Sequence, residues 1–148
     1  MIKKCLTLML FCSNLYAYDP VRPDLKITPG VVDPNATIEK ICTVGYTKTV
    51  RNVSVKTKNQ VFANYHINKV VDRYEIDHLI SLELGGSNDI KNLWPESYTT
   101  SPLNAYKKDA LENKLHDLVC ADKITLEEAQ RVIVEDWVKA YNDYVLQH

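Results

Sequence analysis

Beyond its first 17 residues, the sequence has no long apolar run, no closely spaced pair of cysteines and no internal repeat. A membrane-spanning helix needs about 20 consecutive apolar residues, so we expect no such helix after residue 17. Structural zinc sites usually take thiolates from cysteines a few residues apart, and their absence argues against a zinc site of this kind. The length and composition are typical of one domain with a real core.

The N-terminus has the pattern of a secretory signal peptide over residues 1–17. Lys3 and Lys4 precede a short apolar run, and Ala17 provides the small residue expected at a cleavage position. We therefore expect an exported protein, periplasmic or secreted, with no membrane anchor in its mature form.

The proline distribution predicts the organisation of the mature chain. Residues 18–34 carry four prolines without a sustained apolar period, which predicts an extended N-terminal arm. Residues 35–148 show no break in composition and are expected to form a single α+β domain. Two cysteines, Cys42 and Cys120, lie in this domain, and in an oxidising compartment they most simply form a disulfide. Two buried free thiols are the alternative.

Charge is unevenly distributed along the chain. Loss of Lys3 and Lys4 with the signal peptide lowers the net charge from −1 to −3, which is unexpected for a protein that binds nucleic acid. Residues 40–73 nevertheless contain many basic side chains and one acid, Asp72, so this segment is a candidate phosphate-contacting face. Its basic residues are Lys40, Lys48, Arg51, Lys56, Lys58, Lys69 and Arg73.

The most informative segment contains Asp77 and His78, then Gly85 and Gly86, and then Asn92. Hydrolysis of a phosphodiester needs a base that deprotonates water and a hard cation that offsets charge on the phosphate and the leaving oxygen. A neutral histidine is a suitable base near pH 7, and an adjacent carboxylate offers the oxygen ligand that Mg²⁺ prefers. Asp77 and His78 provide both groups.

These residues are expected to lie on a β-hairpin. Because neighbouring side chains on a regular strand point to opposite faces, Asp77 and His78 are placed at a strand end. The two glycines permit positive φ and favour a loop that returns the chain to a second strand, which follows Asn92.

A helix is predicted after the hairpin, over about residues 101–119, opened by a Ser-Pro pair. Asn104 lies seven residues before Leu111 on its apolar stripe, so its amide needs a partner, either a metal ion or the neighbouring hairpin. Lys107 and Lys108, one turn further on, are expected to reach substrate phosphate.

The remaining helices are expected to serve as scaffold. Thr125 and Glu128 form a capping-box signature that opens a last helix with a broad apolar face. Weaker patterns predict short helices over residues 35–42 and 58–65.

The order Asp-His, Asn and Asn across a hairpin and a helix resembles the HNH branch of the His-Me finger endonucleases, which have a ββα-metal fold. The resemblance covers about residues 74–108, and the 14-residue interval from His78 to Asn92 is close to the usual HNH spacing. Segments 41–51, 92–96 and 108–120 are similar to a group of small exported bacterial HNH proteins.

The resemblance implies a role for each matching residue. His78 would be the general base and Asp77 a metal ligand, while Asn92 would brace the loop and help to orient the histidine. Asn104 would complete the site of one divalent cation, and an Asp with an amide oxygen favours Mg²⁺ or Mn²⁺ over Zn²⁺. The expected contacts to nucleic acid come from Lys107, Lys108, Arg51 and Arg73.

The sequence thus predicts an exported endonuclease that hydrolyses phosphodiester bonds with little sequence specificity, with DNA as the first candidate substrate and RNA as the second. Two other classes stay open: a non-catalytic DNA-binding protein with a degenerate site, and a cell-envelope interaction protein with a purely structural hairpin. At the residue level, Asp77 could orient His78 without touching a metal, and Asn92 could be an ordinary turn residue.

Overall fold

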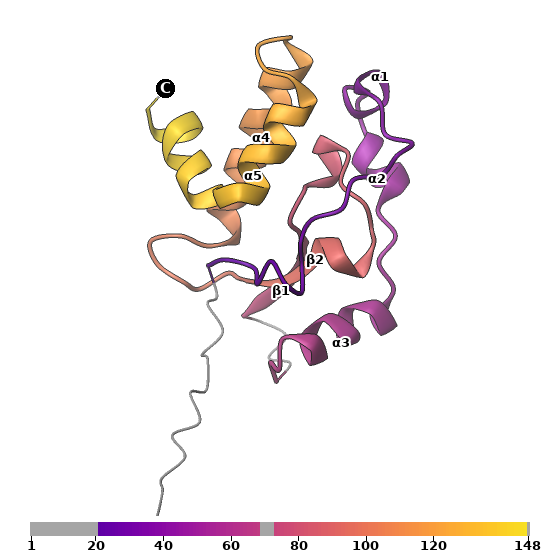
Figure 1. The fold of residues 1–148 in the computed structure, drawn as a ribbon, viewed down its shortest axis with the longest axis vertical. Coiled ribbons are helices and arrows are strands. Elements are labelled where there is room, and N and C mark those ends of the chain that lie inside the picture. The colour runs from indigo at the N-terminus through magenta and orange to yellow at the C-terminus, as the bar shows by residue number, and fades with distance from the viewer. Residues whose placement is uncertain (1–20, 69–72, 148) are drawn as a thin grey trace, which may run out of the picture.

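The computed structural model describes residues 21–68 and 73–147, so the expected signal peptide and Lys69 lie outside the described residues. The fold is of the α+β class, with a two-stranded antiparallel sheet and several helices (Figure 1). In chain order the elements are α1 (Ile38–Ile41), α2 (Tyr46–Val50), α3 (Val55–Asn64), β1 (Tyr74–His78), the 3₁₀ turns η1 (Leu82–Leu84) and η2 (Ile90–Asn92), β2 (Leu93–Ser97), α4 (Ala105–Cys120), α5 (Leu126–Tyr141) and the π-helical turn η3 (Asn142–Leu146).

The expected hairpin is confirmed. Strand β1 pairs with β2 in a register that runs from Tyr74 opposite Ser97 to His78 opposite Leu93, so His78 ends the strand as predicted. The loop between the strands depends on its glycines. Gly85 has a φ of +76°, and a Cβ at Gly86 would lie 1.7 Å from the carbonyl oxygen of Ile80.

Helix boundaries differ from the prediction in places. The last helix is capped as expected, because the Thr125 side chain accepts from the Glu128 N–H at 3.0 Å. Helix α4 begins at Ala105 instead of residue 101, with Asn104 at its N-cap position. Helix α3 begins earlier than predicted, after the cap residue Ser54, and α2 was not predicted. Helix α5 is interrupted at Asp136, where the backbone is extended.

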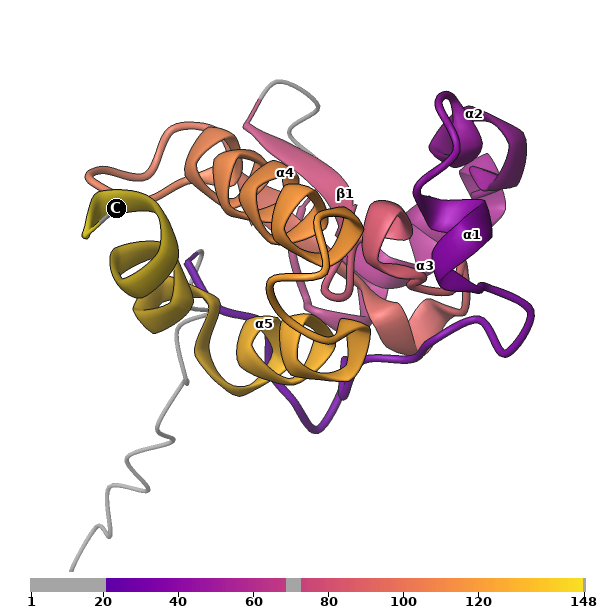
Figure 2. The same ribbon diagram turned by 90° about the horizontal axis from the view of Figure 1, so that it is seen from above.

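Two hydrophobic clusters lie on opposite sides of the hairpin. Helices α4 and α5 pack together over Ile80 and Leu84, while α3 packs its Val61 against Leu93 and Trp94. Figure 1 shows α3 on the opposite side of the hairpin from α4 and α5, and Figure 2 shows α4 lying along β1. The hairpin therefore forms the middle layer of the domain. No helix of the described residues is long and apolar enough to cross a bilayer.

The described part of the N-terminal arm lies on the domain. The hydroxyl of Thr28 is fully buried, donates to the Leu93 carbonyl at 2.9 Å and accepts from the Tyr65 hydroxyl at 2.7 Å. Further contacts are a β-bridge from Val32 to the hairpin loop and a 2.7 Å hydrogen bond from the Trp137 indole to the Val21 carbonyl. The arm thus closes both hydrophobic clusters.

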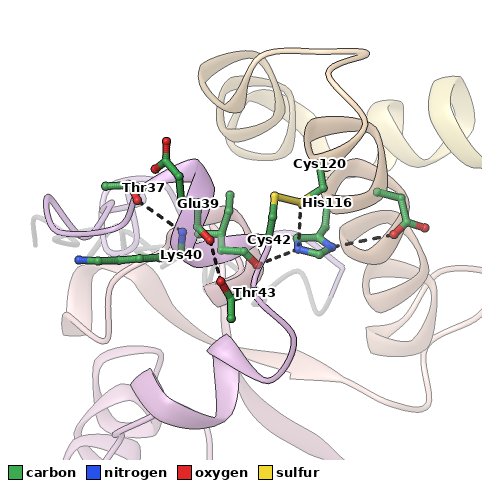
Figure 3. Close-up of a disulfide and its surroundings, with 9 residues drawn as sticks. Thr37, Glu39, Lys40, Cys42, Thr43, His116 and Cys120 are labelled. Atoms are coloured by element: carbon green, nitrogen blue, oxygen red, sulfur yellow. Dashed lines mark hydrogen bonds and ion pairs between the residues drawn. A yellow bond between two sulfur atoms is a disulfide. The ribbon is translucent and has the colours of Figure 1, made fainter.

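The Cys42–Cys120 disulfide is present, so the alternative of two free thiols is wrong. It joins the end of α1 to the end of α4, with the two Cα atoms 5.7 Å apart. Figure 3 shows the His116 imidazole beside the bridge; its Nε2 lies 3.4 Å from the Cys120 sulfur and 3.0 Å from the Ile41 carbonyl oxygen. Because α1 has one buried residue, Ile41, and α2 has none, the bridge is the main anchor of this segment.

Replacing both cysteines by serine should lower the free energy of unfolding by about 3–4 kcal/mol. The bridge spans 78 residues, and freeing a loop of this size raises the entropy of the unfolded chain. Urea unfolding of the oxidised protein and of the Cys42→Ser/Cys120→Ser variant measures the difference. A reductant should destabilise the parent protein alone, and equal stability of the two proteins under oxidising conditions would contradict the account.

Candidate active site

A cavity of about 230 Å³ opens where β1 ends. Asp77 and His78 line it from the strand, and Ser81 to Glu83 line it from the start of η1. Helix α4 contributes Asp109, Glu112 and Asn113 to one wall, while Thr47 and Arg51 come from α2 and the residue after it. The cavity therefore collects residues from four separate elements around the predicted Asp-His pair.

Asn88 fixes the orientation of the His78 ring. The Asn88 Nδ2 donates to the Val50 carbonyl at 2.8 Å, which leaves its Oδ1 facing His78 Nε2 at 3.1 Å and the Asn52 N–H at 3.3 Å. Because this oxygen can only accept, the neutral imidazole carries its proton on Nε2. The lone pair of His78 is therefore on Nδ1, which has the chemistry of a base.

The surroundings of His78 keep its ring neutral. Only 2% of the residue is exposed, although it lines the cavity. Burial lowers the pKa of His78 below its ordinary value, against the opposing effect of the Asp77 carboxylate. A neutral imidazole near pH 7 is the form that accepts a proton from water.

Lys108, which was predicted to contact substrate phosphate, instead holds Asp77. Lys108 Nζ donates to Asp77 Oδ2 at 2.6 Å, to the His78 carbonyl at 2.8 Å and to Glu112 Oε1. Burial alone would raise the pKa of Asp77, but the ammonium beside it lowers that pKa below its usual value. Asp77 is thus an ionised carboxylate at the edge of the cavity.

Further carboxyl groups crowd around Asp77. Burial raises the pKa of Glu96 and of Glu112 well above the usual value, and it raises the pKa of Glu75 to about 6. Burial and the nearby Asp77 charge also raise the pKa of Asp109. Such crowding opposes ionisation of each carboxyl group, and a bound cation would relieve it.

Asn92 braces the hairpin loop, as the resemblance implied. Its side chain is fully buried; Nδ2 donates to the carbonyls of Ile80 and Ser87, and Oδ1 accepts from the N–H groups of Ile80 and Val31. These four bonds use the full capacity of the amide. The side chain that contacts the His78 ring is that of Asn88, so Asn92 acts on the histidine only through the loop.

The structure places Asn104 away from the cavity. Asn104 occupies the N-cap of α4, where its Nδ2 donates to the Thr100 carbonyl at 3.2 Å and its buried Oδ1 has no hydrogen-bond partner among the described residues. Helix α4 lines the cavity with Asp109, Glu112 and Asn113. Glu112 is held by Lys108, whereas Asp109 and Asn113 lie one helical turn apart. They are better placed than Asn104 to share a cation with Asp77.

The four residues expected to contact nucleic acid differ in exposure and in their position relative to the cavity. Arg51 is exposed and lines the cavity, and Lys107 is exposed with its ammonium 5.9 Å from the Tyr141 ring centroid. Arg73 precedes β1, roughly 13 Å from Asp77 along an extended strand. The expected phosphate contact of Lys108 is wrong, because this side chain is buried among carboxylates.

Sequence reasoning missed Asn88, Asp109 and Asn113 and misplaced Lys108. The stripe that placed Asn104 on the inner face of α4 also contains Lys108, four residues further on, so this signal was present. Asp109 and Asn113 share the spacing of one helical turn, which marks a common face but not what that face contacts. Asn88 stands in a Gly-Gly-Ser-Asn-Asp turn, where asparagine is ordinary, so no signal distinguished it.

A second group of potential metal ligands occurs in the described residues. The ligand atoms of Cys42, His116 and Cys120 lie within 4.8 Å of one another. The two sulfurs are bonded to each other, and a disulfide sulfur is not the thiolate that binds a metal. In the oxidised protein this group is therefore the surroundings of the bridge.

Comparison of the chain with models of protein families finds no match, and comparisons with curated proteins and with solved structures find none either. A function for this chain is therefore inferred from the residues and geometry of the cavity.

Replacing Asn88 by alanine should lower the pKa of His78 further and mix its two tautomers. The Asn88 oxygen stabilises the charged ring and fixes the proton of the neutral ring on Nε2. An NMR pH titration of the His78 ring, with ¹⁵N shifts to assign the tautomer, measures both effects. The exposed Asn142→Ala is the matched control; an unchanged tautomer and pKa in Asn88→Ala would show that this contact does not orient the ring.

Proposed function

We propose that this chain is an exported, metal-dependent endonuclease of the HNH type with a ββα-metal core, which hydrolyses phosphodiester bonds in nucleic acid, with DNA as the first candidate substrate and RNA as the second. The observation that carries the proposal is the pairing, at one strand end, of a neutral histidine whose lone pair lies on Nδ1 with an ionised aspartate. The helix that follows the hairpin supplies further oxygen donors to the same cavity. This arrangement supports the strand, strand and helix order of the resemblance.

His78 acts as the general base. Its Nδ1 takes a proton from water as the water oxygen bonds to phosphorus and the P–O bond to the leaving sugar oxygen breaks. The positive ring formed in this step is stabilised by the Asn88 oxygen on Nε2 and by the adjacent Asp77 charge. The leaving oxygen takes up a proton from solvent. Because Asn88 is itself bonded to the Val50 carbonyl, the ring keeps its orientation during proton transfer.

The donor set of the cavity fits a hard divalent cation. Asp77, Asp109 and Asn113 offer carboxylate and amide oxygens, the ligand type that Mg²⁺ and Mn²⁺ prefer, and no sulfur ligand faces the cavity among its lining residues. When bound there, the cation would supply positive charge for the phosphate and the leaving oxygen. Asp77 and the two α4 residues would hold it.

Arg51 and Thr47 would bind the phosphate on the wall opposite α4. Arg51 is exposed at the cavity and can donate two parallel hydrogen bonds to phosphate oxygens. Lys48, Lys56 and Lys58 are exposed on α2 and α3 and extend this basic surface along the chain. Contacts of this kind bind the backbone and carry no sequence information, so little sequence specificity is expected.

The disulfide supports export to an oxidising compartment. The basic start and apolar run of residues 1–17 support the same location. The mature protein would then act in the periplasm or the medium.

The oxidised protein from residue 18 onward should nick supercoiled plasmid when Mg²⁺ or Mn²⁺ is present. Nicking should stop when EDTA removes the cation. His78→Ala should lower the nicking rate at least about 100-fold, because it removes the general base. Agarose gels of timed reactions measure the rate.

His66→Asn is the matched control, because His66 is exposed outside the cavity and its φ of 54° is one that asparagine adopts readily. This variant should keep the parent rate. Intact plasmid in every reaction, with correctly folded protein, would contradict the hydrolytic function and favour the DNA-binding alternative, for which salt-sensitive binding is the diagnostic.

A further inference from the structure

Lys108 lies next to the cavity, in contact with two of the residues that line it, Asp77 and Glu112. It lies on the inner face of α4 and is fully buried, at the level where β1 ends. Its three ammonium protons meet three acceptors: Asp77 Oδ2 at 2.6 Å, the His78 carbonyl at 2.8 Å and Glu112 Oε1. Every donor of the ammonium is used, and every acceptor is an oxygen.

These acceptors are the ligands that a hard metal ion takes. Two carboxylates and a backbone carbonyl surround the nitrogen, and Glu96 adds a further carboxyl group through its hydrogen bond to Asp77. Mg²⁺, Mn²⁺ and Ca²⁺ bind such oxygens in proteins. The space behind Asp77 is therefore a cation site in its chemistry, and an ammonium that belongs to the chain occupies it.

We propose that Lys108 is a positioning residue whose ammonium fills an oxygen-lined cation site behind Asp77, fixes the Asp77 carboxylate and the His78 backbone, and restricts the site to one divalent ion. The role of Lys108 in hydrolysis rests on the proposed nuclease function. The occupation of the cation site by its ammonium does not rest on that function, because these contacts exist whatever the cavity binds.

A tethered ammonium differs from a second metal ion in one respect that matters for the site. It cannot dissociate, so one oxygen of Asp77 stays committed and the aspartate keeps its orientation with or without a bound ion. The His78 carbonyl is held by the same nitrogen, so strand end and helix are joined at the two residues proposed to act in hydrolysis.

The test is the number of Mn²⁺ ions that the oxidised protein binds, counted by EPR titration of free Mn²⁺. The parent protein should bind one ion per chain. Lys108→Ala should bind two, because it removes the ammonium, leaves the oxygens in place and opens space for an ion with water. Its melting temperature without added cation should be lower by about 10 °C or more, since buried carboxylates lose their partner.

Two matched variants separate charge from packing. Lys108→Met refills the space with an apolar chain of similar length, so it should lose stability and still bind one ion. Lys107→Ala removes the exposed neighbour and should match the parent protein in Mn²⁺ count and melting temperature. Propylammonium, which matches the atoms removed in Lys108→Ala, should raise the melting temperature of that variant alone and compete with its second Mn²⁺.

A second Mn²⁺ in Lys108→Ala together with stabilisation by propylammonium supports the proposal. If Lys108→Ala is unfolded without cations, refolding on addition of Mn²⁺ or propylammonium, followed by circular dichroism, also supports it. The same ion count in all variants without amine rescue, or failure to refold with either cation, overturns it. Plasmid nicking by the parent protein is a separate readout, so an inactive protein with this ion count would refute the nuclease function and leave the role of Lys108 standing.

Discussion

The site depends on one buried interaction, the contact of the Lys108 ammonium with Asp77, the His78 carbonyl and Glu112. A buried ammonium without partners is costly, and removing one member of a buried ion pair typically costs about 3–5 kcal/mol. Helix α4 can therefore bury Lys108 only next to the oxygens of Asp77 and His78 at the end of β1. The same contact sets the distance between the hairpin and the helix, and so it shapes the cavity between them.

A second chain of contacts reaches His78 from the opposite wall. The disulfide anchors α1, and α2 follows it directly in the sequence. The last residue of α2, Val50, accepts from Asn88, and Asn88 accepts from the His78 ring. Neither α1 nor α2 buries much apolar surface, so the disulfide stabilises this wall, whereas hydrophobic packing stabilises α4 and α5. The two walls thus differ in what stabilises them, although both position the same histidine.

Much of the framework could be predicted from local sequence signals. The hairpin followed from the strand-like run around Asp77, the two glycines and the return segment, and the last helix followed from its Thr125 cap. The predicted start of α4 was wrong because a Ser-Pro pair favours a helix start only locally, whereas Asn104 occupies the cap position in the folded chain. Helix α2 was missed because it buries no residue and so lacks an apolar stripe.

The site was predicted only in part, because long-range contacts decide it. The Asp-His pair was evident from chemistry and spacing, but its partners come from residues 10 to 31 positions away in the sequence. Lys108 shows the difficulty best. A lysine near a proposed phosphate site suggests a substrate contact. Lys108, however, lies on the inner stripe of α4 among carboxylates and is part of the interior.

The most direct test of the central claim is the location of Mn²⁺ by anomalous scattering from crystals of the oxidised protein soaked at saturating Mn²⁺. We expect one ion in the cavity, in contact with Asp77 and with Asp109 or Asn113, while the Lys108 ammonium stays on the other side of the Asp77 carboxylate. An empty cavity, or an ion bound only at a site remote from Asp77, would contradict a one-metal hydrolytic centre built around Asp77 and His78.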